Sequence, residues 1–202
     1  MKINSILSAT IQELTGRFGL IEPDRAELLG VIAKLISAER KRTSVTLNFI
    51  CTHNSRRSQM AQAWAIAAAG FYKIKNIKSV SGGTEVTAFN RHAVRALSDQ
   101  GFELNMKVQT ANPGYKFLSG EEVITEMYSK TFQQATHEPF IAVMTCDHAD
   151  RNCPLVTGAI ARFSMPFTDP GYSDGAPDES LVYRATADLI GTEMLYLFSM
   201  VR

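Results

Sequence analysis

Apolar residues in the first 43 positions recur at the three- and four-residue spacing that is typical of amphipathic helices. One stripe consists of Ile3, Ile6, Leu7, Ile11 and Leu14. A second stripe runs from Leu28 to Ile36, after turn signals between Gly19 and Pro23. We therefore expect residues 1–43 to form a helical extension that either packs on the core or makes the contact of a homodimer.

From residue 44 onward the pattern changes to short apolar strands that alternate with helical stretches. Strands are expected over Val45–Ile50, Ile77–Val80, Phe140–Thr145 and Ile160–Met165. Helices are expected over Met60–Ala69, Ala88–Gln100, Ser119 to about Ala135, and Asp178 to about Met200. The third of these helices rests on Ser119 and Glu122, which have the spacing of a capping box. Such alternation predicts an α/β domain over residues 44–202, with a parallel sheet and helices on both faces.

The composition is that of an ordinary globular protein with one sizeable core, since 45% of the 202 residues are hydrophobic and 20% are charged. The net charge of +1 gives no reason to expect a nucleic acid or a membrane as a partner. The chain has no apolar stretch of 18 residues, so we expect no transmembrane helix. Acidic residues such as Glu13 and Glu22 interrupt the N-terminal region, so we also expect no signal peptide. Three cysteines are an odd number for a disulfide scaffold and fit a reducing compartment, so the expected location is the cytoplasm.

The first strand leads directly into a polar loop with the character of an anion site. Cys51 ends the strand, and the next helix begins near Ser58. Backbone N–H groups of such a loop converge on a tetrahedral oxyanion, and Arg57 adds a bidentate fork. The same field favours the thiolate of Cys51, which makes this residue a candidate nucleophile. The candidate oxyanion-binding residues are Thr52, His53, Asn54, Ser55, Arg56, Arg57 and Ser58. From spacing alone, Cys51 as a small buried apolar side chain remains an open alternative.

The segment FICTHNSRRSQMAQAW resembles the signature of the low-molecular-weight protein tyrosine phosphatases and of the thioredoxin-coupled arsenate reductases that share their fold. Their usual pattern is Cys-x-Gly-Asn-x-Cys-Arg-Ser. This chain keeps the cysteine, asparagine, arginine and serine of the pattern, and it departs from it at His53 and Arg56. The resemblance covers residues from about 44 to 202 and implies a four-stranded parallel sheet with Cys51 as the nucleophile.

Two further cysteines follow the third expected strand, in VMTCDHADRNCP. Cys146 and Cys153 resemble the Cys-x6-Cys pair of the arsenate reductases, which the plain phosphatases usually lack. The resemblance implies that both are redox-active, and two structural thiols are the alternative. It also implies that Asp169, in an Asp-Pro loop after the fourth strand, is the general acid. An Asp-Pro turn without a catalytic role is the alternative there.

Ser81 follows the second strand and, together with Asn54, is expected to brace the loop by hydrogen bonds. In some of the reductases these positions and a helix glutamate support a potassium ion. Here the glutamate position is Gln62, and we expect neither a metal ion nor a cofactor.

The leading hypothesis for function is reduction of arsenate to arsenite through a relay of the three cysteines. Its partners would be the arsenate or phosphate oxyanion and a thioredoxin-like reductant. The alternative is a low-molecular-weight protein tyrosine phosphatase, which needs only Cys51, Arg57 and Asp169. A non-enzymatic oxyanion or redox sensor is a third hypothesis.

Overall fold

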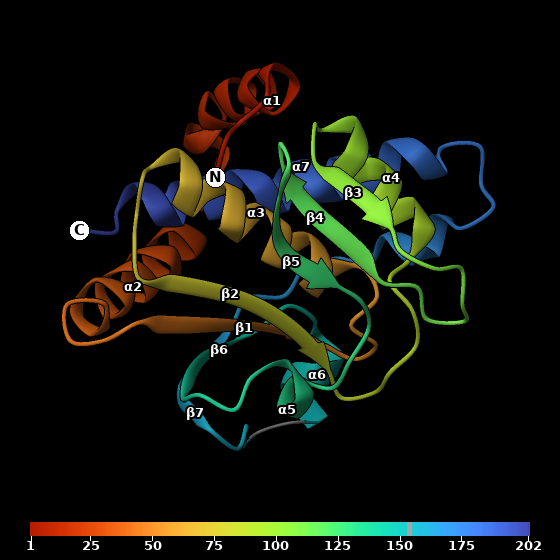
Figure 1. The fold of residues 1–202 in the computed structure, drawn as a ribbon. Coiled ribbons are helices and arrows are strands. Elements are labelled where there is room, and N and C mark those ends of the chain that lie inside the picture. Colours follow the sequence, from red (N-terminus) through yellow and green to blue (C-terminus); the bar gives the residue numbers. More distant parts are fainter. Residues whose placement is uncertain (153–154) are drawn as a thin grey trace.

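The computed structural model describes residues 1–152 and 155–202. Its centre is a four-stranded parallel sheet, as the resemblance predicted, and the order of its strands is β2-β1-β6-β7 (Figure 1). The strands are β1 (Val45–Cys51), β2 (Ile77–Gly83), β6 (Phe140–Met144) and β7 (Ala159–Ser164). The helices are α1 (Ser5–Thr15), α2 (Pro23–Glu39), α3 (Arg57–Phe71), α4 (Arg91–Asp99), α5 (Phe132–Ala135), α6 (Asp147–Asn152) and α7 (Glu179–Ser199). Two short 3-10 helices are η1 (Phe18–Leu20) and η2 (Pro170–Ser173). The remaining strands form a second, smaller sheet, which is described below.

Each face of the central sheet is covered by its own hydrophobic cluster. Phe49 of β1 belongs to the larger cluster, which includes the buried residues of α3 and α7. Ile50, the next residue of the strand, belongs to a smaller cluster with Phe132 of α5 and Ala149 of α6. Side chains of a strand point alternately to its two faces, and all seven residues of β1 are buried, so this strand is covered on both faces. The order of elements thus produces the α/β architecture that the sequence pattern predicted.

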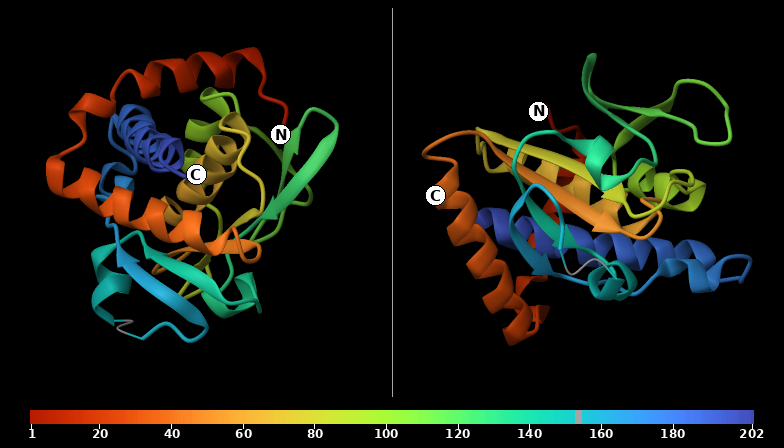
Figure 2. Two further views of the ribbon diagram at one scale, coloured as in Figure 1. Left: turned by 90° about the vertical axis from the view of Figure 1, so that its left-hand side faces the viewer. Right: turned by 90° about the horizontal axis from the view of Figure 1, so that it is seen from below.

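The two N-terminal helices pack against α7 and share the larger cluster (Figure 2). In the left-hand view of Figure 2, α1 and α2 surround the C-terminal helix on the side away from α3. Most residues of the apolar stripes lie on the buried faces of these helices, since Leu7, Ile11, Leu14, Leu29, Ile32 and Ile36 are each at most 1% exposed, whereas Ile6 of the first stripe is 60% exposed. The helical prediction for residues 1–43 is therefore confirmed, and both helices contribute to the main core.

The helix expected from Ser119 to about Ala135 is wrong. The region forms strands instead, in an antiparallel sheet of β3 (Glu103–Met106), β4 (Tyr115–Ser119) and β5 (Glu122–Met127). Gly120 has φ +68°, and this left-handed residue turns the chain between β4 and β5, so Ser119 and Glu122 are cross-strand partners and not a helix cap. The capping box of this region is made by Thr131 and Gln134, at the start of the short α5.

Among the described residues, no helix is both long enough and apolar enough to cross a lipid bilayer.

Candidate oxyanion site

The candidate site lies at the carboxyl edge of the central sheet, where the ends of three neighbouring strands meet. Cys51 is the last residue of β1 and pairs in register with Gly83, the last residue of β2. Cys146 follows the end of β6 by two positions. Because ligands of open parallel sheets bind outside the carboxyl ends of the strands, this edge is where an anion site is expected. The topology alone therefore brings two of the cysteines to the same place.

The loop from Thr52 to Arg56 is held by a buried network of side-chain hydrogen bonds. Asn54 has φ +47°, in the left-handed region, and its Nδ2 donates to Ser58 Oγ and to Ser81 Oγ, each at 2.9 Å. Ser81 Oγ in turn donates to Gln62 Oε1 at 2.6 Å. Ser58 Oγ lies 3.1 Å from Cys51 Sγ, and the thiol is only 4% exposed. These contacts agree with the bracing expected of Asn54 and Ser81.

His53 stands where the family pattern has glycine, and the structure explains why a histidine is tolerated. Asn54 is the loop residue with a left-handed backbone, whereas φ of His53 is not positive. Its backbone carbonyl accepts hydrogen bonds from Thr87 Oγ1 and Ser129 Oγ. Its ring lies at the surface, where Nε2 is 3.5 Å from a carboxylate oxygen of Glu85. The backbone at His53 therefore has a conformation that a residue with a side chain adopts without strain.

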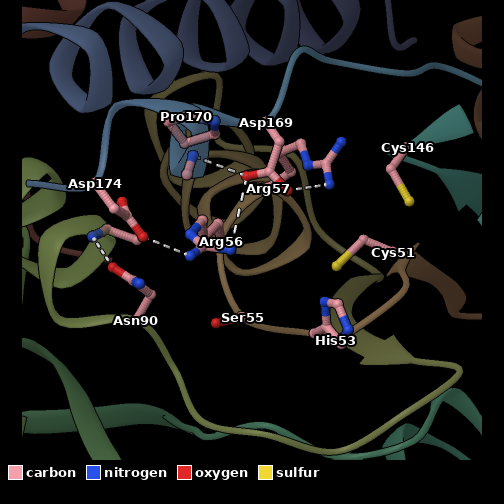
Figure 3. Close-up of polar contacts among 12 residues, drawn as sticks. Cys51, His53, Ser55, Arg56, Arg57, Asn90, Cys146, Asp169, Pro170 and Asp174 are labelled. Carbon is pink, nitrogen blue, oxygen red and sulfur yellow. Dashed lines mark hydrogen bonds and ion pairs between the residues drawn. The ribbon is translucent and has the colours of Figure 1, made fainter. Parts of the chain in front are cut away.

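Arg57 joins the loop to the segment that carries Asp169 (Figure 3). Its Nη2 donates to Asp169 Oδ2 at 2.7 Å, and its Nη1 donates to the carbonyl of Phe167 at 2.9 Å. Its Nε is buried and has no hydrogen-bond partner within the described part of the chain. A buried guanidinium N–H without a partner is costly, and an oxyanion in the loop would satisfy it. Arg57 and Asp169, two predicted site residues that are 112 positions apart in the sequence, thus contact each other beside the loop.

Arg56 is directed away from the thiol, toward the start of α7 (Figure 3). Its Nε donates to Tyr183 Oη at 2.8 Å, and its Nη2 donates to Asp174 Oδ2 at 2.9 Å. Burial alone would lower the pKa of Arg56, but the bond to Tyr183 and the charges of Asp169 and Asp174 raise it above its usual value. Burial, together with the bond to Asp174, raises the pKa of Tyr183 to about 12. Arg56 therefore connects the loop to α7, the helix that follows the segment carrying Asp169.

Cys146 lies against the loop and is almost fully buried, with an exposed fraction of 1%. Its Sγ is 3.5 Å from Thr52 Oγ1, and the amide of Ala149 donates to it at 3.4 Å. The same Thr52 hydroxyl lies 3.2 Å from Nδ1 of His148. Figure 3 draws Cys146 and Cys51 on the same side of Arg57. The third predicted cysteine, Cys153, lies outside the described residues.

Comparisons with known proteins agree with this geometry, although no family model matches the chain. Arsenate reductase 2 of Staphylococcus epidermidis is 29% identical over 125 residues, which is 62% of this chain and 78% of that protein. An arsenate reductase of Halalkalibacterium halodurans is also 29% identical, over 71% of this chain and 87% of its own. Among solved structures, a low-molecular-weight phosphotyrosine phosphatase of Vibrio cholerae has a TM-score of 0.50 and 20% identity, covering 77% of this chain and 95% of its own. A structure described as an arsenate reductase in the phosphate binding state has a TM-score of 0.50 and 17% identity, covering 78% and 99%.

The chain has a fold like that of the low-molecular-weight protein tyrosine phosphatases.

Several residues that shape the candidate site were not singled out from the sequence. Gln59 Nε2 donates to the carbonyl of Asn54, and the backbone amide of Lys130 donates to Asn54 Oδ1. Tyr183 holds Arg56, as described above. Gln59 lies within the quoted signature segment but outside its pattern positions, and Lys130 and Tyr183 are far from the loop in sequence, so no local signal marks their roles. The described residues contain no group of three His, Cys, Asp or Glu side chains that is arranged to hold a metal ion.

A cavity of about 540 Å³ adjoins the loop on the side of the small antiparallel sheet. His53, Ser55 and Arg56 of the loop form part of its wall. Other walls come from the segment before α4, with Phe89 and Asn90, and from the region around β3 and β4. The phosphatase-like core therefore presents space for a larger group next to the candidate anion site.

Proposed function

We propose that this protein reduces arsenate to arsenite with its cysteine thiols. The observation that carries the proposal is the second buried thiol beside the loop, with Cys146 Sγ 3.5 Å from Thr52 Oγ1. Hydrolysis of a phosphate ester needs one thiol, whereas reduction of arsenic needs a second thiol to complete a disulfide. The arsenate reductases among the curated relatives support the same choice.

The first step is nucleophilic attack on arsenic. The thiolate of Cys51 forms a bond to the arsenic of an arsenate that the loop amides and Arg57 hold. One arsenic–oxygen bond breaks, and Asp169 supplies the proton with which that oxygen leaves as water. This role is supported by the position of the Asp169 carboxylate, which lies 2.7 Å from Nη2 of Arg57, the cation proposed to hold the arsenate.

The second step transfers two electrons to arsenic. The thiolate of Cys146 attacks the sulfur of Cys51, the electron pair of the sulfur–arsenic bond stays with arsenic, and arsenite leaves. The resulting Cys51–Cys146 disulfide is attacked by the thiolate of Cys153, which releases Cys51 and leaves a Cys146–Cys153 disulfide. A thioredoxin-like dithiol then reduces this last disulfide by exchange.

The test is arsenite release in the presence of thioredoxin, thioredoxin reductase and NADPH. We expect sustained release from the wild type, none from Cys51→Ser, and at most one turnover from Cys153→Ser. Cys146→Ser should release no arsenite while it retains hydrolysis of p-nitrophenyl phosphate. Unaltered multiple turnover of Cys146→Ser or Cys153→Ser would refute the relay.

The cavity beside the loop favours a second candidate, which is hydrolysis of a phosphomonoester. Free arsenate has no organic group to occupy a space of about 540 Å³, whereas the alcohol or phenol part of an ester would fit there. This activity would use Cys51, Arg57 and Asp169 without the other cysteines. Rapid hydrolysis of aryl phosphates by a Cys146→Ser variant, with no arsenite formed by the wild type, would decide for it.

A further inference from the structure

Arg25 of α2 contacts residues 166–169, the segment that carries Asp169 and that we call the acid segment. Its Nη2 donates a 2.6 Å hydrogen bond to the carbonyl of Pro166, which lies 141 positions away. Its guanidinium also lies over the ring of Phe167, with 5.3 Å between Cζ and the ring centroid. Asp169 follows only two residues after this ring. A side chain from a part of the chain that precedes the first strand therefore contacts the segment that carries the candidate acid.

Arg25 is itself fixed by a buried carboxylate of α7. Its Nε lies 3.2 Å from Glu193 Oε1, and the side chain of Glu193 is only 5% exposed. The guanidinium is planar and rigid, so a bond from Nε to Glu193 sets the direction in which Nη2 points. Glu193 thereby aims Arg25 at the carbonyl of Pro166. The arrangement links α2 and α7 to one short stretch of irregular chain.

Phe167 is held on its other sides by the sheet and by the loop. Its amide donates to the carbonyl of Thr145 at 3.1 Å, and its own carbonyl accepts from Arg57 Nη1 at 2.9 Å. The ring is only 5% exposed. Arg57 therefore has two acceptors on this segment, the Phe167 carbonyl and the Asp169 carboxylate. A shift of Phe167 would move both of them together.

We propose that Arg25 is a positioning residue that fixes the segment Pro166–Asp169 and so places the carboxyl of Asp169 at the candidate site. The N-terminal extension is then a part of the site's architecture, in addition to covering the core. The consequence for reaction rate rests on the proposed role of Asp169 as general acid.

The chain offers a matched control for Arg25. Arg17 also belongs to the N-terminal region and also bonds to a carboxylate of α7, with Nη1 3.3 Å from Asp188 Oδ2. Its other ion pair is with Glu13 of α1. Arg25→Met and Arg17→Met therefore each remove one guanidinium and one ion pair to α7. Only the first removes contacts to Pro166 and Phe167.

The first measurement is amide hydrogen exchange over residues 165–172, which does not depend on any activity. We expect Arg25→Met to speed exchange in this segment by about tenfold, as for loss of a charge-assisted hydrogen bond to the backbone. Exchange in β1 should stay unchanged, and Arg17→Met should leave residues 165–172 as in the wild type. Should Arg25→Met fail to fold, Arg25→Lys is the second variant. Its ammonium can pair with Glu193 but lacks the fork that also reaches Pro166, so exchange should again rise.

The second measurement compares two aryl phosphates by kcat/KM, which includes departure of the leaving group. Phenol is a poorer leaving group than p-nitrophenol and depends more on a proton from the acid. Arg25→Met should therefore lose about tenfold more kcat/KM with phenyl phosphate than with p-nitrophenyl phosphate, which is part of the range that general acid catalysis spans. Purely structural damage would lower both equally.

Exchange over residues 165–172 that is the same in Arg25→Met and Arg17→Met would overturn the proposal. Equal losses with the two esters would also overturn it, because the acid would then be in place without Arg25. A wild type that turns over neither arsenate nor the esters would instead refute the proposed function. In that case the exchange comparison still decides whether Arg25 fixes the segment.

Discussion

The buried pair of Glu193 and Arg25 makes a quantitative prediction about how stability depends on pH. Burial raises the pKa of Glu193 to about 7, although the charge of Arg25 and its hydrogen bond oppose the rise. Its second oxygen, Oε2, is buried without a hydrogen-bond partner among the described residues, which accounts for the cost of ionising it. Between pH 4.5 and 7 the folded protein thus keeps a proton on Glu193 that the unfolded chain has lost.

The sign and the size follow from this difference. A carboxyl with a raised pKa in the folded state makes the protein less stable as the pH rises through the window between the two pKa values. Above about pH 7 both states are ionised and the contribution becomes constant. For one site, the free energy of unfolding should fall by about 2–3 kcal/mol between pH 5 and pH 8 because of Glu193.

Glu193→Gln removes this titration and keeps an oxygen for Arg25. Urea unfolding of both proteins, followed by circular dichroism at several pH values, gives the difference in their free energies of unfolding. Any fixed cost of the amide cancels in the comparison between pH values, and groups that titrate in both proteins cancel as well. We expect the variant to gain about 2–3 kcal/mol relative to the wild type from pH 5 to pH 8. A difference that is constant with pH, or that changes in the opposite direction, would refute the reasoning.

Two other substitutions test the loop and its support. A Cβ on Gly83 would lie 2.6 Å from the carbonyl oxygen of Thr52 and 2.8 Å from the amide nitrogen of Asn54. Gly83→Ala should therefore lower the free energy of unfolding by about 1–3 kcal/mol and weaken phosphate binding, which calorimetry measures. Its control is Gly30→Ala in α2, where the added methyl group meets nothing within 4 Å. This change should raise the free energy of unfolding by about 0.5–1 kcal/mol. Equal effects of the two substitutions would contradict the packing argument. Arg56→Lys should lower the free energy of unfolding by about 1 kcal/mol, because an ammonium cannot bond to Tyr183 and Asp174 as one rigid fork does. Exposed Arg91→Lys is its control, and a loss no larger than in that control would count against the network.

The sequence was sufficient to predict the central sheet and the residues gathered at its edge. Cys51 ends one strand, Cys146 and Asp169 follow two others, and the carboxyl ends of parallel strands must meet at one edge. Their convergence therefore follows from the topology and needs no knowledge of tertiary contacts. The same rule explains why Ser81, at the end of β2, meets Asn54.

The remaining features depend on contacts that leave no local signal. Ser119 and Glu122 fit a capping box as well as they fit a hairpin, and only the left-handed Gly120 between them decides for the turn. Arg25 is an ordinary polar residue of an amphipathic helix until α2 packs on α7 and brings it to Pro166. The direction of the Arg56 side chain, away from the thiol and toward α7, likewise depends on Tyr183, which is 127 positions away in the sequence.

The most direct test of the proposed chemistry is a single turnover of the fully reduced protein with excess arsenate and no external reductant. Arsenite is counted after an acid quench, and the thiols are mapped by alkylation and mass spectrometry. The account predicts about one arsenite per chain, with two thiols lost and a disulfide between Cys146 and Cys153. All three thiols remaining reduced, with no arsenite formed, would contradict it.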